Sequence, residues 1–309
     1  MNTKKQQTLS WFILTALVLV WGSSFILIKK SLLYFTAPEV GFLRIVITFL
    51  FLSPLVYKRL KKIDRKYFWL LTVSGIIGSL LPALLFAISE TGIDSAIAGT
   101  LNSLTPLFTL LIGLMFFKFR TRWYNVLGVI VGLLGAVGLI MANSGGAVNV
   151  DIFYASLVVI ASLLYAINVN IVKSYFHGIS SLDITVLSFF FIGLPVLVYI
   201  ALFSRIPQML WTDARAWEGI GYLSILAVLG TGVALIAYNQ LIKWKNPVFA
   251  SSVTYLIPIV AILWGVLDGE KFTLTYVLWI LLILAGVFLV NARPYAKLNL
   301  ATRILFWKK

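Results

Sequence analysis

Ten apolar runs, each long enough to cross a lipid bilayer, follow one another along the 309-residue chain. A helix needs about 20 predominantly apolar residues to span the hydrocarbon core, within a range of about 17 to 25. The runs lie at residues 11–28, 38–57, 67–87, 94–117, 123–142, 152–172, 182–203, 217–241, 247–267 and 273–291. The connections between them are too short to hold a soluble domain. This pattern predicts an all-α membrane protein with ten transmembrane helices.

The composition excludes the water-soluble classes of protein. Charged residues make up 11% of the chain, against about 25% in a soluble globular domain, and the mean hydropathy is +1.01. The net charge of +15 raises the question of nucleic-acid binding. The basic residues lie at the ends of the apolar runs, however, which is typical of membrane proteins and disfavours a nucleic-acid partner. The absence of cysteine excludes disulfides, thiolate nucleophiles and cysteine-based metal sites.

The positions of the basic residues predict how the chain is oriented. With ten spans, both termini lie on the same side of the membrane. All 25 basic residues fall on that side, except Lys29, Lys30, Arg205, Arg215 and Lys271 on the opposite side and Arg44 inside a span. Because Lys and Arg are enriched in cytoplasmic loops, we expect both termini in the cytoplasm of a bacterial cell, in its cytoplasmic membrane. Residues 293–309 then form a basic cytoplasmic tail.

An internal duplication is visible in the sequence. Residues 96–116 align with residues 248–268, which lie 152 positions later, and the alignment pairs Pro106 with Pro258. Further pairs occur at or near this offset, and Trp21…Lys29 matches Tyr165…Lys173 near the start of each half. The chain is therefore expected to consist of two related halves.

The boundary between the halves is predicted at the polar, glycine-rich stretch 142–151. It divides the chain into a first repeat at 1–145 and a second at 146–292. Each half holds five spans, and an odd number makes the second half start from the opposite side of the membrane. Two inverted five-helix repeats are thus expected, with the solute site near the midplane between them.

Four segments are similar to those of a known transporter family. They are WGSSFILIKK (21–30), PEVGFLRIVITFLFL (38–52), SLTPLFTLLIG (103–113) and YLIPIVAILWGVLDGE (255–270). In this order, and with the duplication, they resemble the EamA-type transporters of the drug/metabolite transporter superfamily. The resemblance implies a fold of five plus five inverted helices and the export or exchange of small organic metabolites such as amino acids, nucleosides, sugars and drugs. One departure is that Gly269-Glu270 stands opposite Phe117-Lys118, which argues against a symmetric role for Glu270.

Polar side chains within the spans mark a candidate solute site. Unpaired polar groups are costly in hydrocarbon, so they should face the bundle interior or a wet cavity. The candidate substrate-binding residues are Trp21, Ser24, Asn102, Thr105, Tyr165, Asn168, Tyr238, Asn239 and Tyr255. For a single Ser or Thr, the alternative is a hydrogen bond between helices or to its own backbone. Such a cavity would be neutral, aromatic and amide-lined, and would suit a neutral or zwitterionic solute with an apolar part.

Spans five and ten have almost no polar residues in their central portions, so we expect them at the periphery. In span five, the run at 128–138 carries small residues four apart, which allow close contact between helices.

Two matched prolines are candidate hinges. Pro106 and Pro258 lie in equivalent spans of the two halves, and each removes a helical partner from the carbonyl four residues earlier, at Asn102 and Thr254. Matched helix interruptions in two repeats are a sequence signal of a transport site, because a freed carbonyl can accept a hydrogen bond from the solute. The alternative is a packing kink whose carbonyls are bonded by neighbouring side chains.

Arg44 is the one ionisable residue well inside a span, and burial there costs at least about 2.5 kcal/mol on insertion scales. Two roles compete: Arg44 pairs with a carboxylate such as Glu39 as an outer gate, or it attracts an anionic group of the solute. We assign Arg44 and Glu39 as the gate. No carboxylate cluster lies within a span and the single histidine, His177, lies in a loop, so no metal site or cofactor is expected.

The leading functional hypothesis is a secondary transporter that works by alternating access, as a monomer or weak homo-oligomer in the bilayer. A proton-coupled antiporter is the alternative, with Glu39 and Glu90 as titratable groups near the outer face. A membrane enzyme is disfavoured, because the spans lack both an acidic cluster for Mg²⁺–diphosphate and a buried His or Lys near a Ser, so no catalytic residue is assigned. A channel-like subunit is the remaining alternative.

Overall fold

The structure is a computed structural model that describes residues 3–93, 95–117, 123–143, 151–245, 247–267 and 274–291. Its regular elements are helices throughout. Six described stretches have the length and apolarity to cross a membrane: Gln6–Ser31, Ala37–Leu60, Arg65–Ser89, Ile152–Tyr175, Ser181–Phe203 and Ala216–Trp244. Shorter apolar helices supply the remaining rods. The prediction of an all-α membrane protein with about ten helices is confirmed, and the predicted tail at 293–309 lies outside the described residues.

The first half of the chain contains five rods, four of which are interrupted helices. They comprise α1 (Thr3–Gly22) with α2 (Ser24–Ser31), α3 (Ala37–Leu52) with η1 (Ser53–Leu55) and α4 (Val56–Leu60), η2 (Arg65–Tyr67) with α5 (Phe68–Gly75), the π-helical η3 (Ile76–Leu80) and α6 (Leu81–Ser89), α7 (Ser95–Leu101) with η4 (Asn102–Leu104) and α8 (Thr105–Phe116), and α9 (Trp123–Asn143). Each interruption re-aims the side chains that follow it.

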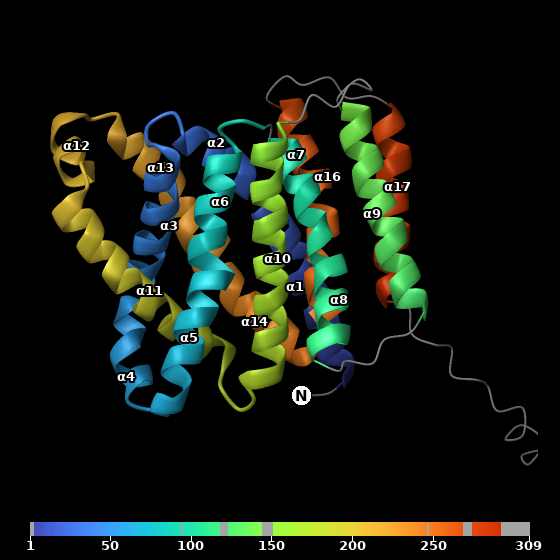
Figure 1. Cartoon of the computed structure of the whole chain (residues 1–309), viewed down its shortest axis with the longest axis horizontal. Helices are drawn as coiled ribbons and strands as arrows, with labels where there is room; N and C mark the ends of the chain where they lie inside the picture. Colours follow the sequence, from blue (N-terminus) through green and yellow to red (C-terminus); the bar gives the residue numbers. More distant parts are fainter. Residues whose placement is uncertain are drawn as a thin grey trace, which may run out of the picture.

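The second half also contains five rods, but its first two are uninterrupted helices and a short extra helix follows the second. It comprises α10 (Ile152–Tyr175), α11 (Ser181–Phe203), the short α12 (Ile206–Thr212), α13 (Ala216–Ala227) with the π-helical η5 (Val228–Val233) and α14 (Ala234–Trp244), α15 (Pro247–Ser251) with α16 (Val253–Leu267), and α17 (Leu274–Asn291). In Figure 1, α1 rises from the N-terminus, whereas α10 descends toward the loop that leads to α11. The first helices of the two halves therefore run in opposite directions.

Helices α9 and α17 pair with each other at one edge of the bundle (Figure 1). Their backbones touch: a Cβ atom added at Gly286 would lie 2.5 Å from the Cα of Gly132 and 2.8 Å from the carbonyl oxygen of Gly128. This confirms that spans five and ten pack peripherally and that the small residues of span five permit close helix contact.

Two π-helical turns occupy matching positions in the two halves. Ile76–Leu80 and Val228–Val233 start 152 residues apart, and each interrupts the third span of its half. Single π turns are rare and frequently occur at functional sites. Their presence at the repeat offset indicates that the two halves share a local backbone distortion as well as a sequence pattern.

A second matched feature fixes α3 against α11. The N-caps Thr36 and Ser180 lie 144 residues apart, and an acidic residue follows each by three positions. Glu39 binds Arg205 through Nε–Oε1 and Nη2–Oε2 contacts of 2.8 and 3.1 Å, and Asp183 binds Arg59. Each ion pair joins the start of the second span in one half to a residue at the end, or just past the end, of the second span in the other half.

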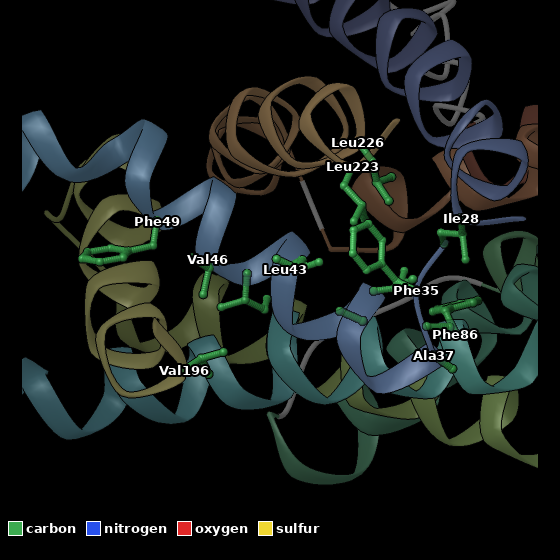
Figure 2. Close-up of a cluster of buried hydrophobic side chains, with 14 of the residues drawn as sticks. Ile28, Phe35, Ala37, Leu43, Val46, Phe49, Phe86, Val196, Leu223 and Leu226 are labelled. Atoms are coloured by element: carbon green, nitrogen blue, oxygen red, sulfur yellow. The ribbon is translucent and has the colours of Figure 1, made fainter. Parts of the chain in front are cut away.

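The core between these helices is formed by close-packed apolar side chains from both halves. Figure 2 shows Leu43 and Val46 of α3 beside Val196 of α11, with Leu223 of α13 above Phe35. In lipid there is no hydrophobic force between helices, so this interdigitation stabilises the bundle through van der Waals contact. It packs α3 directly against α11.

Candidate solute site

An internal cavity lies between the two halves and is lined by the first four spans of each. Among its described lining residues, none comes from the peripheral helices α9 and α17. The cavity has a volume of about 100 Å³. That is several times the roughly 10–15 Å³ that a cavity needs to hold one water.

Eight of the nine predicted substrate-binding residues line this cavity together. They are Trp21, Ser24, Asn102, Thr105, Tyr165, Asn168, Tyr238 and Asn239. Tyr255 does not line it: its ring is fully buried against Gly132, and its hydroxyl lies 3.5 Å from the carbonyl oxygen of Val129. Tyr255 fills space between α16 and α9. Solute binding by the eight lining residues stays a prediction.

Trp21 fixes one wall of the cavity. Its indole Nε1 donates a hydrogen bond of 2.9 Å to the carbonyl of Gly230, in the π turn of the other half. Its ring meets Tyr238 edge-on at a centroid distance of 4.9 Å. The π turn thus accepts a bond from a side chain 209 positions away in the chain, and the two aromatic rings form an apolar surface with polar edges.

The amides of Asn102, which is buried, and Asn168, which is half-buried, are held by neighbouring hydroxyls. Asn102 Oδ1 accepts hydrogen bonds from Thr105 Oγ1 at 3.1 Å and Ser162 Oγ at 3.4 Å, and Asn168 Oδ1 accepts one from Ser74 Oγ at 2.7 Å. The Nδ2 groups of Asn102 and Asn168 have no hydrogen-bond partner among the described residues. Each amide is therefore oriented by the protein and keeps its donor groups for a solute or water.

Two phenols add further polar groups. Tyr165 and Tyr238 both line the cavity, and their hydroxyls make no hydrogen bond among the residues that the structure describes. Asn239, in contrast, donates from Nδ2 to Thr185 Oγ1 at 3.0 Å. A buried phenol usually has a hydrogen-bond partner, so these two hydroxyls are well placed to bind whatever fills the cavity.

The structure does not bring Arg44 and Glu39 together. Arg44 lines the cavity, where its Nε donates to Thr231 Oγ1 at 2.7 Å. Glu39 instead caps α3 through Thr36 and binds Arg205. Five residues along a helix turn the side chain by about 140°, so the two groups leave α3 on different sides. Their role as a gate stays a prediction.

The prolines lie outside the cavity lining. Pro106 is at the start of α8 and Pro258 is inside α16. The carbonyl of Asn102 accepts from Thr105 Oγ1 at 2.7 Å, and the carbonyl of Thr254 accepts from Ser103 Oγ at 3.0 Å. Hydroxyls of the protein thus donate to both carbonyls that lack a helical partner because of the prolines. This arrangement is that of a packing kink whose carbonyls are bonded by neighbouring side chains. A hinge role for the prolines stays a prediction.

Several lining residues were missed by the sequence reasoning. Most are small side chains: Ser74, Gly78, Ser79, Thr185, Ser188, Gly230 and Thr231. The signal was present, because Gly78-Ser79 and Gly230-Thr231 stand 152 residues apart, the offset that pairs the prolines.

The two glycines make equivalent contacts across the halves. A Cβ at Gly78 would collide with the amide of Asn168, 2.6 Å from its Cγ, and a Cβ at Gly230 would lie 3.0 Å from Ser24 Oγ. Ser24 and Asn168 are themselves equivalent at an offset of 144. Each π turn therefore packs on the first span of the opposite half, and glycine makes that approach possible.

The described residues contain no group of three or more His, Cys, Asp or Glu side chains that could hold a metal ion. Glu90 follows the last residue of the third span and interacts electrostatically with Arg44, which lines the cavity. Glu90 Oε2 accepts from Ser95 Oγ at 2.8 Å, and Oε1 is buried without a partner among the described residues. Burial raises the pKa of Glu90 to about 8, although the charges of Arg44 and Lys29 act in the opposite direction.

The protonation of Glu90 predicts how stability depends on pH. Between its ordinary value of 4.5 and about 8, the folded protein holds a proton that the unfolded chain has released. Stability therefore falls as the pH rises through this window. We expect the Tm of the purified protein to decrease from pH 5 to pH 8, and Glu90→Gln to flatten that decrease. The exposed Glu218→Gln should retain the wild-type slope; the same flattening in both variants would contradict the assignment.

Comparisons with known proteins agree on one family. The model of the EamA-like transporter family matches residues 8–141 and again residues 152–292. An "Uncharacterized transporter" of Archaeoglobus fulgidus is 25% identical over 91% of this chain and 98% of its own length. The "Uncharacterized inner membrane transporter YedA" of Escherichia coli K12 is 27% identical over 91% of this chain and 92% of its own.

A solved crystal structure shares the fold. It superposes with a TM-score of 0.70 and 17% identity, covering 91% of this chain and 96% of the other. The family match covers most of the chain, the relatives align along nearly their full lengths, and the cavity lies where both matched segments meet. The chain is thus a multi-pass membrane protein and belongs to the EamA-like transporter family.

Proposed function

We propose that this protein is a secondary transporter that exports or exchanges small organic metabolites by alternating access. The observation that supports this most is the cavity between the halves, whose amides, phenols and aromatic rings come from both. Such a lining suits a neutral or zwitterionic solute with an apolar part, because it offers hydrogen bonds and ring faces without a cluster of charges.

The two segments 1–145 and 146–292 are proposed to be inverted repeats. Opposite directions of α1 and α10, the matched π turns and the exchanged contacts Gly78–Asn168 and Gly230–Ser24 support this. In inverted-repeat transporters, one half rocks against the other around a fixed midplane site. The ion pairs Glu39–Arg205 and Arg59–Asp183 join α3 to α11 near opposite ends. Because α3 and α11 belong to different halves, rocking of one half against the other would have to stretch or break one of these pairs at a time.

The protein is proposed to act in the bacterial cytoplasmic membrane as a monomer or weak homo-oligomer, with both termini in the cytoplasm. The excess of basic residues on the terminal side supports the orientation, and the name of the Escherichia coli relative supports the location. Reporter fusions that are active only in the cytoplasm should be active at both ends; activity at one end alone would refute the topology.

Coupling to protons is the second candidate mechanism. It is favoured by Glu90, whose buried oxygen lacks a partner among the described residues and whose pKa lies near neutral. Transport in proteoliposomes with and without a pH gradient separates the two mechanisms. Exchange or uniport predicts transport without the gradient, and a strict requirement for it would favour the antiporter.

Single changes in the cavity test the function directly. Loss of one hydrogen bond to the solute costs about 1 kcal/mol of binding free energy, which lowers the affinity roughly fivefold. We therefore expect Asn102→Ala and Tyr238→Phe each to weaken binding of a transported solute by about five- to tenfold, measured by ligand-induced shifts of Tm and by uptake into proteoliposomes. Tyr255→Phe makes the same chemical change at a phenol that does not line the cavity, so it should leave the affinity for the solute unchanged. If all three variants bound the solute with the affinity of the wild type, the solute site would have to lie outside this cavity.

A further inference from the structure

Arg44 is a cation in the cavity, and the other described residues that line the cavity are neutral. It lies on α3, deep in the protein, and its side chain is partly open to the cavity. Nε is fixed by the 2.7 Å bond to Thr231 Oγ1, and that hydroxyl in turn donates to the carbonyl of Leu226 at 3.1 Å. The guanidinium is thus oriented by the π turn of the opposite half, although only one of its five N–H donors is bonded among the described residues.

The acidic residues that the structure describes are engaged elsewhere or lie beyond ion-pair distance of Arg44. Glu39 binds Arg205, Asp183 binds Arg59, Asp64 binds Lys66 and Asp213 binds Arg215. Glu218 accepts from Tyr34, Asp151 caps α10, and Glu90 accepts from Ser95 and acts on Arg44 only electrostatically. A buried charge without a paired ion is costly, and a charge inside a membrane protein marks a functional site whose partner must be found.

The second half of the molecule has no matching charge. The offset of 144 that pairs Thr36 with Ser180 and Glu39 with Asp183 places Ser188 opposite Arg44, and Ser188 also lines the cavity. The cavity is therefore cationic at one end only. A guanidinium presents parallel N–H donors that match a carboxylate in two-point geometry, so a solute with one carboxylate complements this end.

We propose that Arg44 is the anchor for a carboxylate of the transported solute, and that this protein carries small monocarboxylates, either amino acids or the acids that lack the amino group. The apolar part of the solute would lie against Trp21, Phe86 and Tyr238, which border the same cavity. Thr231 is the positioning residue that holds the guanidinium. This inference rests on the proposed transport function. It narrows the zwitterionic solutes to amino acids and adds simple monocarboxylate anions to the proposed substrates.

The test uses three matched sets of probes and the full-length protein in detergent and in proteoliposomes. The sets are the apolar α-amino acids, the amines that result from their decarboxylation, and the carboxylic acids that lack the amino group. Neutral nucleosides and sugars form a fourth set. Binding is measured as the concentration dependence of Tm, and transport as uptake of the labelled compound. Amino acids are distinguished from simple acids by comparing the first set with the third.

The expected result is that carboxylates bind and are transported, whereas the matched amines are not. Removing one partner of a desolvated charge pair costs about 2 kcal/mol or more, so Arg44→Gln should weaken carboxylate binding about thirtyfold or more. Arg44→Lys should restore part of it, and Thr231→Val should weaken it less. Arg215→Gln, which removes an exposed arginine, is the matched control and should bind like the wild type.

A purely structural role for Arg44 would give a different pattern. Arg44→Gln would then lower Tm without changing the preference between acid and amine, whereas an anchor leaves Tm unchanged or raises it, because an unpaired buried charge is removed. A preference for amines would overturn the inference. So would binding of nucleosides or sugars with an affinity that Arg44→Gln does not change. Both outcomes would leave the proposed transport function in place. Absence of binding and transport in all four sets would refute both.

Discussion

Replacing Gly78 with leucine is expected to abolish transport while leaving the protein folded and inserted. Gly78 lies in the π turn η3, and even a single Cβ there would collide with the amide of Asn168. The larger side chain must displace Asn168, break its 2.7 Å bond from Ser74 Oγ and fill part of a cavity of only about 100 Å³. Uptake into proteoliposomes should fall to the level of liposomes without protein.

Two further variants test this prediction: Gly230→Leu makes the equivalent change in the second half, and Gly221→Leu is the control. Gly230 is the equivalent position in the second half, where a Cβ would lie 3.0 Å from Ser24 Oγ, so Gly230→Leu should also block transport. Gly221 lies on α13 with nothing within 4 Å of an added Cβ. Gly221→Leu makes the same chemical change in open space and should transport normally. Normal uptake by Gly78→Leu would show that solute does not pass through this cavity.

The number and type of helices could be predicted from the sequence because they depend on one strong physical rule. A backbone in hydrocarbon must satisfy its hydrogen bonds internally, so each long apolar run becomes a helix. The peripheral position of α9 and α17 could also be predicted, because polar side chains face the interior or a wet cavity and these two helices have almost none in their central portions. Local interruptions such as η3 and η5 could not be predicted, because apolar periodicity does not distinguish an α turn from a π turn.

The candidate site was predictable where burying a polar group is most costly. Asn102, Asn168 and Tyr238 carry large polar groups, and all three line the cavity. Tyr255, also predicted to bind the solute, does not line the cavity, because its phenol packs toward the carbonyl of Val129. Gly78 and Gly230 were not predicted to line the cavity, because a glycine has no side chain that marks a site. Its role depends on which residues pack against it in the folded protein.

Arg44 shows a different limit of sequence reasoning. Its burial could be predicted, but its partner could not, because Glu39 is close along the chain and points elsewhere in space. The hydroxyl that holds Arg44, on Thr231, is 187 residues away. Such contacts between the halves depend on how the halves assemble, which periodicity and composition do not specify.

Gly286→Leu is expected to destabilise the protein more than any other change considered for the helix interfaces. The Cβ position of Gly286 lies 2.5 Å from the Cα of Gly132 and 2.8 Å from the carbonyl oxygen of Gly128. These are backbone atoms, so no side-chain rotation can relieve the collision and the two helices must separate. Overpacking of a tight contact costs about 3 kcal/mol at the upper end of its usual range. Helix association in lipid depends on such close approach of small residues.

The measurement is the free energy of unfolding in detergent micelles, with Ala285→Leu as the control. Ala285 is the neighbouring residue on α17 and is exposed, so an equally large side chain meets lipid or detergent there. We expect the unfolding free energy of Ala285→Leu to match the wild type and that of Gly286→Leu to fall sharply. Because α9 and α17 do not line the cavity, the fraction of Gly286→Leu that remains folded should bind solute with unchanged affinity. A loss of affinity without a loss of stability would mean that this helix pair belongs to the transport machinery instead of its frame.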